Sequence, residues 1–452
     1  MSTAADVAAR TAGRDRFVDA LRVLSLVVVI LGHWLMADVR PDGEVGNALV
    51  SVPALTVATW VLQVMPLFFL VGGVAHGFAL ESLESRLGAA PGRYAVFVRS
   101  RAGRLLRPTL VLVAVWVAVG LLLRALGLAG SDLVLTALRL VTQPLWFVGI
   151  YLGVAALAPA MLAAHRRWGL LVVAGLVAGA CTVDLLRFGF GLTVVGTLNF
   201  ALVWLAVHQL GFCLASGALT RGRAVLMTAG GLAALVLLVT AGPYPVSMVG
   251  LPGESVSNMA PPTVALLAQA VAMVGAAVLL RDAVGRLLGR PRVWAGVVLL
   301  GSAAMTAFLW HLSALFLAVL GMWALGWTPS PVGTAVWWAI RPVWLAVLAA
   351  LTVVLVALFR RFEAVPRPEV GERSRWVDVV AALGAALCAV GVLMVSVTGV
   401  DVLGGDPVRF VVLDVVPAAA GGVLLAGLGL MALAGRQSTS TGWPAVMRSS
   451  SS

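Results

Sequence analysis

Charge is scarce in this sequence, and lysine is absent. Only 11% of the 452 residues are charged, whereas a soluble globular protein carries about 25%. Hydrophobic residues make up 61% of the chain, and the mean hydropathy is +1.04. A soluble chain of this length would need the polar surface of two or three domains, which this composition does not supply. The composition therefore excludes ordinary soluble enzymes and predicts a polytopic membrane protein.

Motifs for metals and disulfides are also missing. The three cysteines, Cys181, Cys213 and Cys388, lie in apolar stretches without a CxxC pair, which argues against a disulfide framework or a metal site. The sequence contains no HExxH or GxSxG motif. Its net charge of +12 comes from arginine alone, which is typical of loops facing the cytoplasm or anionic lipid rather than nucleic acid. We therefore predict no metal site and no permanently bound cofactor.

Long apolar stretches are what the sequence has instead. A helix needs about 20 apolar residues to span a bilayer, and twelve stretches meet this requirement. The sequence thus predicts an all-α membrane helix bundle of about twelve transmembrane helices. The predicted spans are residues 17–37, 54–78, 108–127, 145–164, 169–187, 198–217, 224–241, 263–281, 295–323, 336–359, 377–399 and 410–434.

The arginines predict how this bundle is oriented. When the N-terminus is placed in the cytoplasm, 24 arginines fall on the cytoplasmic side, six fall outside and Arg22 lies within the first span. The positive-inside rule predicts this asymmetry. We therefore expect a multi-pass plasma-membrane protein with both termini in the cytoplasm. The six arginines expected outside are Arg40, Arg124, Arg139, Arg187, Arg341 and Arg409.

The first span carries three ionisable side chains, which are costly in a membrane and are therefore candidates for function. Arg22 and His33 are eleven residues apart, so they share one helix face about 16 Å apart along the axis. Asp19 can pair with Arg22 at the i,i+3 spacing. The alternative is that Asp19 and Arg22 are ordinary interfacial charges, but it does not explain His33.

A second cluster of charge is the segment FVRSRAGRLLRPTL. Arg104 and Arg107 are spaced i,i+3 before the third span, so both can face one cavity, and Pro108 suits the first turn of that helix. With Arg99 and Arg101 they form a cationic patch whose guanidinium forks suit the phosphates of acyl-CoA. The alternative is a positive-inside anchor against anionic lipid, and the residues leave both open.

The histidines outside the first span carry weaker signals. His311 lies near the middle of the predicted ninth span, where a lone histidine is more often a hydrogen-bonded packing residue than a functional one. The same interpretation applies to His208. His76 and His165 fall near the cytoplasmic ends of predicted spans, and we interpret them as interfacial.

Taken together, these residues resemble the acyltransferase 3 family of integral membrane acyltransferases, which O-acetylate sugars and other cell-surface or secreted acceptors. The resemblance rests first on DALR at 19–22 followed by ten residues and His33, and on RLLRP at 104–108. The segments PLFFLVGG, PLWFVGIYL and FLWH follow in the family's order. The match extends over roughly residues 14–360, and the Arg-x10-His pair is its most specific element.

The resemblance implies transfer of an acyl group, with acetyl favoured, from cytoplasmic acyl-CoA to a hydroxyl group of a carbohydrate or other extracytoplasmic acceptor. It implies that His33 is the essential catalytic residue, acting as a general base or as a nucleophile. Arg22 would serve the acyl-CoA side of the catalytic site, and His311 would orient groups or transfer a second proton. The residues implied in binding acyl-CoA are Arg99, Arg101, Arg104 and Arg107.

The sequence departs from the family in two places. Val71-Gly72 stands where the family usually has the serine of FFxLSG, so no role is transferred to that hydroxyl group. Two predicted spans also follow the ten-span core. We therefore expect an acyltransferase-like membrane domain at 14–361, two additional helices at 362–435, and disordered cytoplasmic ends at 1–13 and 436–452, whose composition cannot bury a core.

A secondary transporter or flippase of a small or lipid-linked substrate is the main alternative, since such proteins also have twelve spans and charges near the membrane midplane. A transporter predicts polar groups along several helices, whereas the charge here is concentrated in the first span. The expected partners are acyl-CoA, a hydroxyl acceptor and membrane lipid, without nucleic acid. The sequence leaves the acceptor, the acyl chain length and the oligomeric state open.

Overall fold

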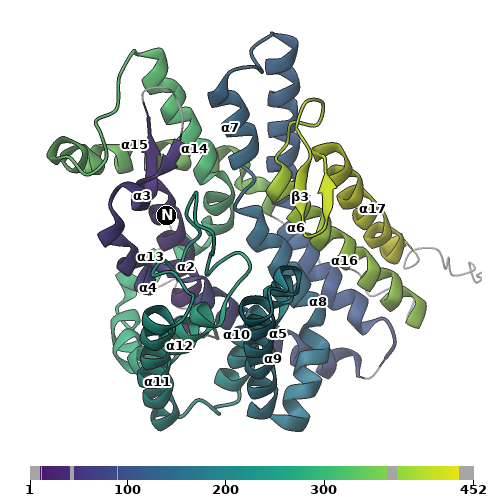
Figure 1. The fold of residues 1–452 in the computed structure, drawn as a ribbon. Coiled ribbons are helices and arrows are strands. Elements are labelled where there is room, and N and C mark those ends of the chain that lie inside the picture. The colour runs from purple at the N-terminus through teal and green to yellow at the C-terminus, as the bar shows by residue number, and fades with distance from the viewer. Residues whose placement is uncertain (1–10, 12, 41–44, 89, 364–373, 437–452) are drawn as a thin grey trace, which may run out of the picture.

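The computed structural model describes residues 11, 13–40, 45–88, 90–363 and 374–436. Within these residues, twelve helices are long and apolar enough to cross a membrane, which confirms the predicted all-helical bundle (Figure 1). Most of the two ends that we predict to be disordered lies outside the described residues.

Short connections join most of the helices. The connection between the fourth and fifth long helices is the single residue Gly169, whose φ of +54° is strained for other residues. The long helices are α2 (Arg16–Met36), α5 (Met65–Leu87), α6 (Arg93–Ala125), α8 (Leu145–Trp168), α9 (Leu170–Gly189), α10 (Asn199–Ala215), α11 (Arg221–Ala241), α12 (Val264–Leu288), α14 (Ala304–Ala324), α15 (Ala335–Phe359), α16 (Arg375–Thr398) and α17 (Pro417–Arg436).

Shorter elements lie between the long helices. Two antiparallel hairpins pair β1 (Ala37–Val39) with β2 (Val45–Asn47), and β3 (Val408–Phe410) with β4 (Leu413–Val415). The short helices are α3 (Ala48–Ser51), η1 (Pro53–Ala58), α4 (Thr59–Leu62), α7 (Asp132–Leu140), η2 (Thr193–Leu198), α13 (Pro291–Gly301) and η3 (Arg360–Glu363).

Two details of the predicted spans are wrong. α6 begins at Arg93, so the arginine cluster lies within the helix, and Pro108 is in the helix interior rather than in the first turn. Arginine is a good helix former, so the helix continues beyond the apolar stretch that hydropathy detects. The predicted ninth span is two helices, because α13 ends at Gly301 and α14 begins at Ala304. Glycine and serine, which form helices less well, lie at this break.

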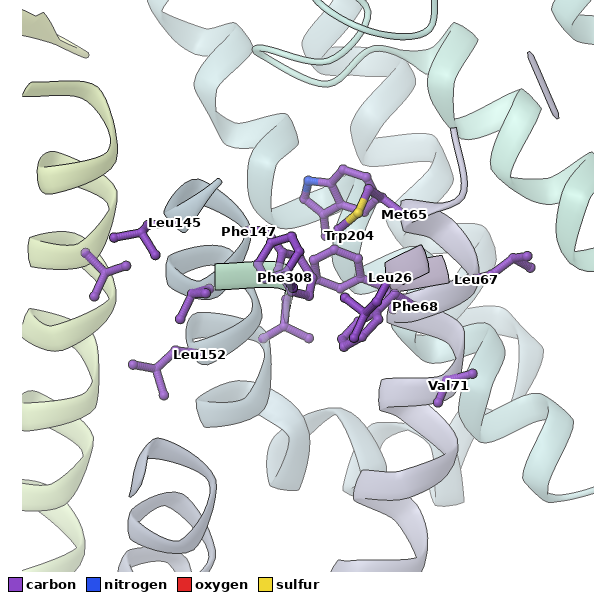
Figure 2. Close-up of a cluster of buried hydrophobic side chains, with 14 of the residues drawn as sticks. Leu26, Met65, Leu67, Phe68, Val71, Leu145, Phe147, Leu152, Trp204 and Phe308 are labelled. Carbon is purple, nitrogen blue, oxygen red and sulfur yellow. The ribbon is translucent and has the colours of Figure 1, made fainter. Parts of the chain in front are cut away.

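An aromatic core joins four helices beside α2. Phe69 of α5 stacks on Trp204 of α10 with ring centroids 4.5 Å apart. Phe147 of α8 contacts the ring of Phe308 of α14 edge-on at 5.5 Å. Figure 2 shows Phe147, Trp204 and Phe308 converging on Leu26 of α2. Such aromatic pairs contribute about 0.5–1.5 kcal/mol each beyond the area that they bury, so α2 packs against a rigid support.

Glycines bring α5 and α10 into backbone contact. A Cβ atom at Gly73 would clash with the carbonyl oxygen of His208 and with Gly211, and a Cβ atom at Gly211 would clash with the carbonyl oxygen of Leu70. Small residues allow such close approach between helices in a membrane. Gly73, at the end of the PLFFLVGG segment, therefore makes a packing contact with α10.

The last two long helices form one edge of the bundle. α16 and α17 pack against each other, and α16 also packs against α6 and α8; this pair is yellow-green at the right of Figure 1. Backbone atoms of α17 lie where side chains would stand at Gly384 and Gly391, which again permits close packing. The pair thus extends the bundle beside α6 and α8.

Candidate active site

Two histidines meet inside the bundle. His311 Nε2 of α14 lies 3.2 Å from His33 Nδ1 of α2, and the ring centroids are 4.9 Å apart. The His33 side chain is half-buried, whereas His311 is fully buried. The structure therefore brings together two histidines that the sequence separates by 278 positions. Of the two, His33 is the more exposed.

Backbone carbonyl groups determine where the protons of this pair lie. His33 Nδ1 is 2.9 Å from the carbonyl oxygen of Val29, and His311 Nδ1 contacts the carbonyl oxygen of Phe308. A carbonyl oxygen only accepts, so each Nδ1 carries the proton of its neutral ring. His311 Nε2 then accepts from the His33 Nδ1–H group. His33 Nε2 is left unprotonated, which makes it a base.

Tryptophan side chains hold the histidine pair in place. Trp34 Nε1 donates to the carbonyl oxygen of His311 at 3.1 Å, and Trp344 Nε1 of α15 donates to the carbonyl oxygen of Trp34 at 3.1 Å. Trp116 Nε1 of α6 donates to Ser313 Oγ at 2.9 Å. These bonds satisfy the buried indole donors, and they join α14 to α2 and α6, and α2 to α15.

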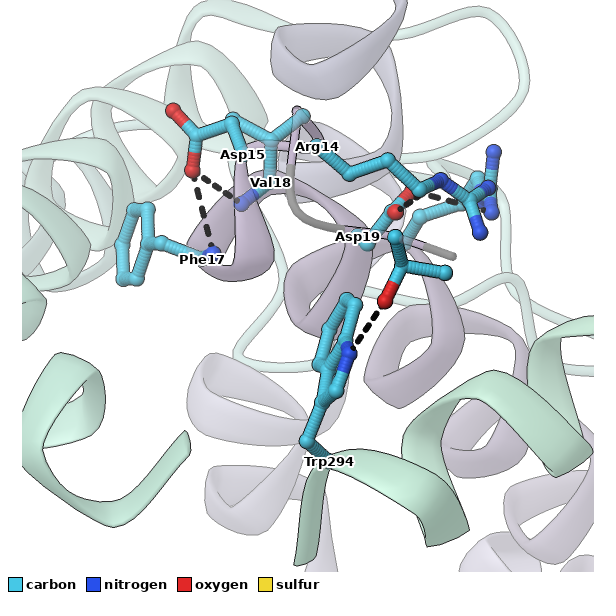
Figure 3. A network of polar contacts seen from close by, with 8 residues as sticks. Arg14, Asp15, Phe17, Val18, Asp19 and Trp294 are labelled. Carbon is cyan, nitrogen blue, oxygen red and sulfur yellow. Dashed lines mark hydrogen bonds and ion pairs between the residues drawn. The ribbon is translucent and has the colours of Figure 1, made fainter. Parts of the chain in front are cut away.

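Arg22 lies nearer the beginning of α2 and is ion-paired. Arg22 Nη2 is 3.0 Å from Asp19 Oδ1, as the i,i+3 spacing predicts, and Arg14 Nε is 3.0 Å from Asp19 Oδ2. Asp15 caps the first backbone N–H groups of α2 (Figure 3) and pairs with Arg281 Nη2 of α12 at 2.9 Å. Two arginines thus share one carboxylate at Asp19, which leaves this region positive.

The four arginines of the predicted cationic patch have different surroundings. Arg101 is half-buried, and its guanidinium carbon lies 5.5 Å from the centre of the Phe97 ring. Arg99 is turned instead toward Gly435 of α17. Arg104 and Arg107 are exposed. The predicted patch of four is therefore divided, with Arg99 directed away from the interior that Arg101 faces.

Tyr151 of α8 is a candidate that the sequence reasoning missed. It interacts electrostatically with Arg101 and Arg22. A Cβ atom at Gly72 would lie 2.7 Å from Tyr151 Cε2 and 2.9 Å from its hydroxyl oxygen. Gly72 stands at the serine position of FFxLSG. Tyr151 therefore occupies the space that the serine side chain would fill, and its own hydroxyl group lies there. The rarity of tyrosine could have drawn attention to this residue, since the sequence has only three tyrosines.

A second histidine pair lies beside Tyr151. His76 Nδ1 is 3.0 Å from His208 Nε2, and the Tyr151 hydroxyl group is 3.5 Å from His76 Nε2. The interfacial interpretation of His76 is wrong, because its side chain is only 1% exposed. α5 continues for eleven residues beyond it to Leu87, which places His76 in mid-helix.

The site combines histidine side chains with cationic groups. In the part of the chain that the structure describes, no three His, Cys, Asp or Glu side chains are grouped so that they could hold a metal ion. His33 supplies the base, and Arg22 and Arg101 supply positive charge around Tyr151. This arrangement suits proton transfer next to an anionic substrate.

Comparison with known proteins gives one match. A family model described as an acyltransferase domain matches residues 15–361, which is more than three quarters of the chain. No curated protein matches the sequence, and no solved structure matches it.

Proposed function

Because the chain belongs to the acyltransferase 3 family of membrane acyltransferases, we propose that it transfers an acyl group, in the favoured case acetyl, from cytoplasmic acyl-CoA to an extracytoplasmic hydroxyl acceptor. The observation that carries this proposal is the 3.2 Å contact between His311 Nε2 and His33 Nδ1. That contact leaves a basic nitrogen on the more exposed of the two rings. A carbohydrate is the acceptor class that the family resemblance favours.

His33 Nε2 removes the proton of the acceptor hydroxyl group while the hydroxyl oxygen attacks the thioester carbonyl carbon. The carbon–sulfur bond breaks, and the His33 imidazolium returns the proton to the departing thiolate, which gives the ester product and the CoA thiol. General-base catalysis of this kind contributes about 10²–10⁴-fold. His311 keeps His33 in the reactive tautomer, as the third member of a catalytic triad does. Here His311 takes the place of the triad carboxylate, and the backbone carbonyl group of Phe308 in turn holds His311.

We favour the general-base role over a covalent acyl-imidazole. If His33 were acylated, a second base would have to deprotonate the acceptor. Among the described residues, the titratable side chain in hydrogen-bond contact with His33 is His311. Both His311 nitrogens are already engaged, one by Phe308 and one by His33. Direct transfer of the acyl group to the acceptor requires only one unprotonated ring nitrogen, and His33 Nε2 supplies it.

The donor binds on the arginine side of the site. Arg101 Nε is buried and has no hydrogen-bond partner, so it has a donor to offer to a ligand. Arg22 and Arg101 both interact with Tyr151, and Arg101 with Arg104. Guanidinium groups bind phosphate oxygens with two parallel hydrogen bonds. We therefore assign Arg22, Arg101 and Arg104 to the phosphates and pantetheine arm of acyl-CoA.

Acyl-CoA consumption by the purified protein in detergent tests this function. We expect H33Q to lower the rate at least about 100-fold, because it removes the general base. The matched control is H165Q, since His165 has only a 3.9 Å contact with the thiol of Cys213 and a ring contact with Phe212. A rate for H33Q above a tenth of the wild-type rate would contradict the assignment. Mass spectrometry of the quenched enzyme should detect no acylated His33.

A further inference from the structure

A small aromatic pocket lies between α15 and the ends of β1 and α14. It is lined by Trp327, Trp337, Trp344, Arg341 and Val39, among others. Trp337, Arg341 and Trp344 follow one another at i, i+4 and i+7 on α15, so they share one helix face. We refer to this cavity as the Arg341 pocket. The arginine count places it at the extracytoplasmic side.

Arg341 has hydrogen-bond donors without partners in this pocket. Its guanidinium carbon lies 3.8 Å from the centre of the Trp337 ring. Nε and Nη1 are both buried, and neither has a hydrogen-bond partner. Stacking on an aromatic face leaves the N–H groups of a guanidinium directed along its own plane. Buried charged donors without acceptors destabilise a structure, so an anion bound here would remove that cost.

Asp38 of the neighbouring hairpin does not engage the buried Nε and Nη1 donors of Arg341. Asp38 of β1 interacts electrostatically with Arg341. Its Oδ2, however, pairs with Arg40 Nε at 3.7 Å. The free donors of Arg341 are therefore left for a ligand.

The pocket adjoins the histidine pair. Trp344, which lines the pocket, donates to the carbonyl oxygen of Trp34. Trp34 directly follows His33 and donates to the carbonyl oxygen of His311. A molecule held at Arg341 is thus separated from the histidines by one layer of tryptophan side chains.

The size of the pocket limits what enters it. Its volume is about 40 Å³, while one water molecule needs about 10–15 Å³ on the same measure. An acid group fits, but a whole sugar ring does not. Trp327 at the pocket is 49% exposed, so it offers an open aromatic surface to the rest of the ligand.

We propose that the Arg341 pocket binds the acceptor, and that the acceptor is an acid whose carboxylate or phosphate group pairs with Arg341. This proposal rests on the acyltransferase function above and specifies its acceptor class as anionic. The ring or chain that carries the acid group lies against the exposed tryptophan.

Equilibrium binding tests the proposal without any turnover. Purified full-length protein in nanodiscs of zwitterionic lipid would be titrated with radiolabelled glucuronate, with glucose as the neutral counterpart and glucose 6-phosphate as the phosphate probe. We expect saturable binding of at least one acidic probe and at least tenfold weaker binding of glucose. R341Q should weaken binding of the acidic probe at least tenfold, and R341K should weaken it less. The matched control R409Q changes an exposed arginine that pairs with Asp414, and it should bind as the wild type does.

Equal binding of acidic and neutral probes, or equal binding by the wild type and R341Q, would overturn the proposal. Loss of probe binding in nanodiscs that contain anionic phospholipid would assign the pocket to a lipid headgroup and would also overturn it. Because acyl-CoA is absent from this experiment, failure of the wild type to consume acyl-CoA counts against the proposed function alone. Failure of Arg341-dependent binding counts against the anionic acceptor alone.

Discussion

At the scale of single residues, the His33 ring is held by the carbonyl oxygen of Val29 on its own helix and by a histidine from a distant part of the chain. His311 Nδ1 contacts the carbonyl oxygen of Phe308, which leaves His311 Nε2 as the acceptor for His33 Nδ1–H. His311 is fully buried, so it acts through His33 rather than on a substrate. We therefore regard His311 as a positioning residue.

Replacement of His311 should separate this role from a merely structural one. In H311A the His33 Nδ1–H group loses its second acceptor and keeps only the carbonyl oxygen of Val29, and we expect kcat to fall about 10- to 100-fold while KM for acyl-CoA stays within twofold. H311Q keeps an oxygen acceptor and should recover part of kcat. Steady-state kinetics of both variants would measure the difference. Equal kcat values for H311A and H311Q, or a loss that appears mainly in KM, would count against the assignment.

Spacing within one helix was enough to predict the Asp19–Arg22 pair, which the structure has at 3.0 Å. The same reasoning placed Arg22 and His33 on one face. It did not foresee that His311 contacts His33, or that Tyr151 fills the space beside Gly72. These contacts join residues of different helices, and helix periodicity carries no information about which helices are neighbours.

At the scale of elements, the backbone contact between α5 and α10 positions much of the interior. Gly73 and Gly211 meet there, and His76 and His208 of the same two helices are hydrogen-bonded. Any side chain at either glycine has to push the helices apart. Separation would also move Tyr151, which contacts both Gly72 and His76.

We expect G73A to destabilise the protein by about 1–3 kcal/mol, because it overpacks a helix contact. The apparent melting temperature in detergent, followed by size-exclusion chromatography after heating, would fall accordingly. The matched control is G175A on α9, where a Cβ atom meets nothing within 4 Å and alanine improves helix propensity. G175A should leave the melting temperature unchanged or raise it. A melting temperature for G73A equal to that of the wild type would contradict the close-contact interpretation.

The number of long helices was predictable because hydropathy responds to the membrane thickness. The ends of the helices were less predictable. α6 continues through its arginines to Arg93, because arginine side chains stabilise a helix outside the hydrocarbon as well as within its edge. The predicted ninth span is divided at 301–304, where glycine and serine form helices less well, but the overall hydropathy of the stretch does not reveal the break.

At the scale of the whole molecule, the arginine distribution and the proposed chemistry imply the same orientation. The arginines at 93–107 of α6 and the N-terminal part of α2 belong to the proposed cytoplasmic side, whereas the Arg341 pocket belongs to the opposite side. Donor and acceptor then reach His33 from different compartments. The protein would act as an acyl relay across the membrane.

Sidedness is testable with cysteines and vesicles. In a C181A background, which removes the exposed native thiol, D406C should react with a membrane-impermeant maleimide in intact cells. S85C should react only after permeabilisation, because it lies near the end of α5 that we assign to the cytoplasm. Sealed inside-out vesicles should consume added acyl-CoA, and sealed right-side-out vesicles should not. The reverse labelling pattern, or donor consumption by sealed right-side-out vesicles, would refute the relay.

The His33–His311 pair ends on the neutral carbonyl group of Phe308, and the reaction proposed for this pair has an energetic consequence for the cell. In the proposed reaction an acyl group leaves for the outer compartment, and a hydrogen atom from the acceptor returns with the CoA thiol. Both groups are neutral, so no net charge crosses the bilayer. A membrane potential shifts the free energy of a process by about 2.3 kcal/mol per 100 mV for each charge moved. Acyl transfer through His33 would therefore be electroneutral, and the thioester alone would supply its driving force.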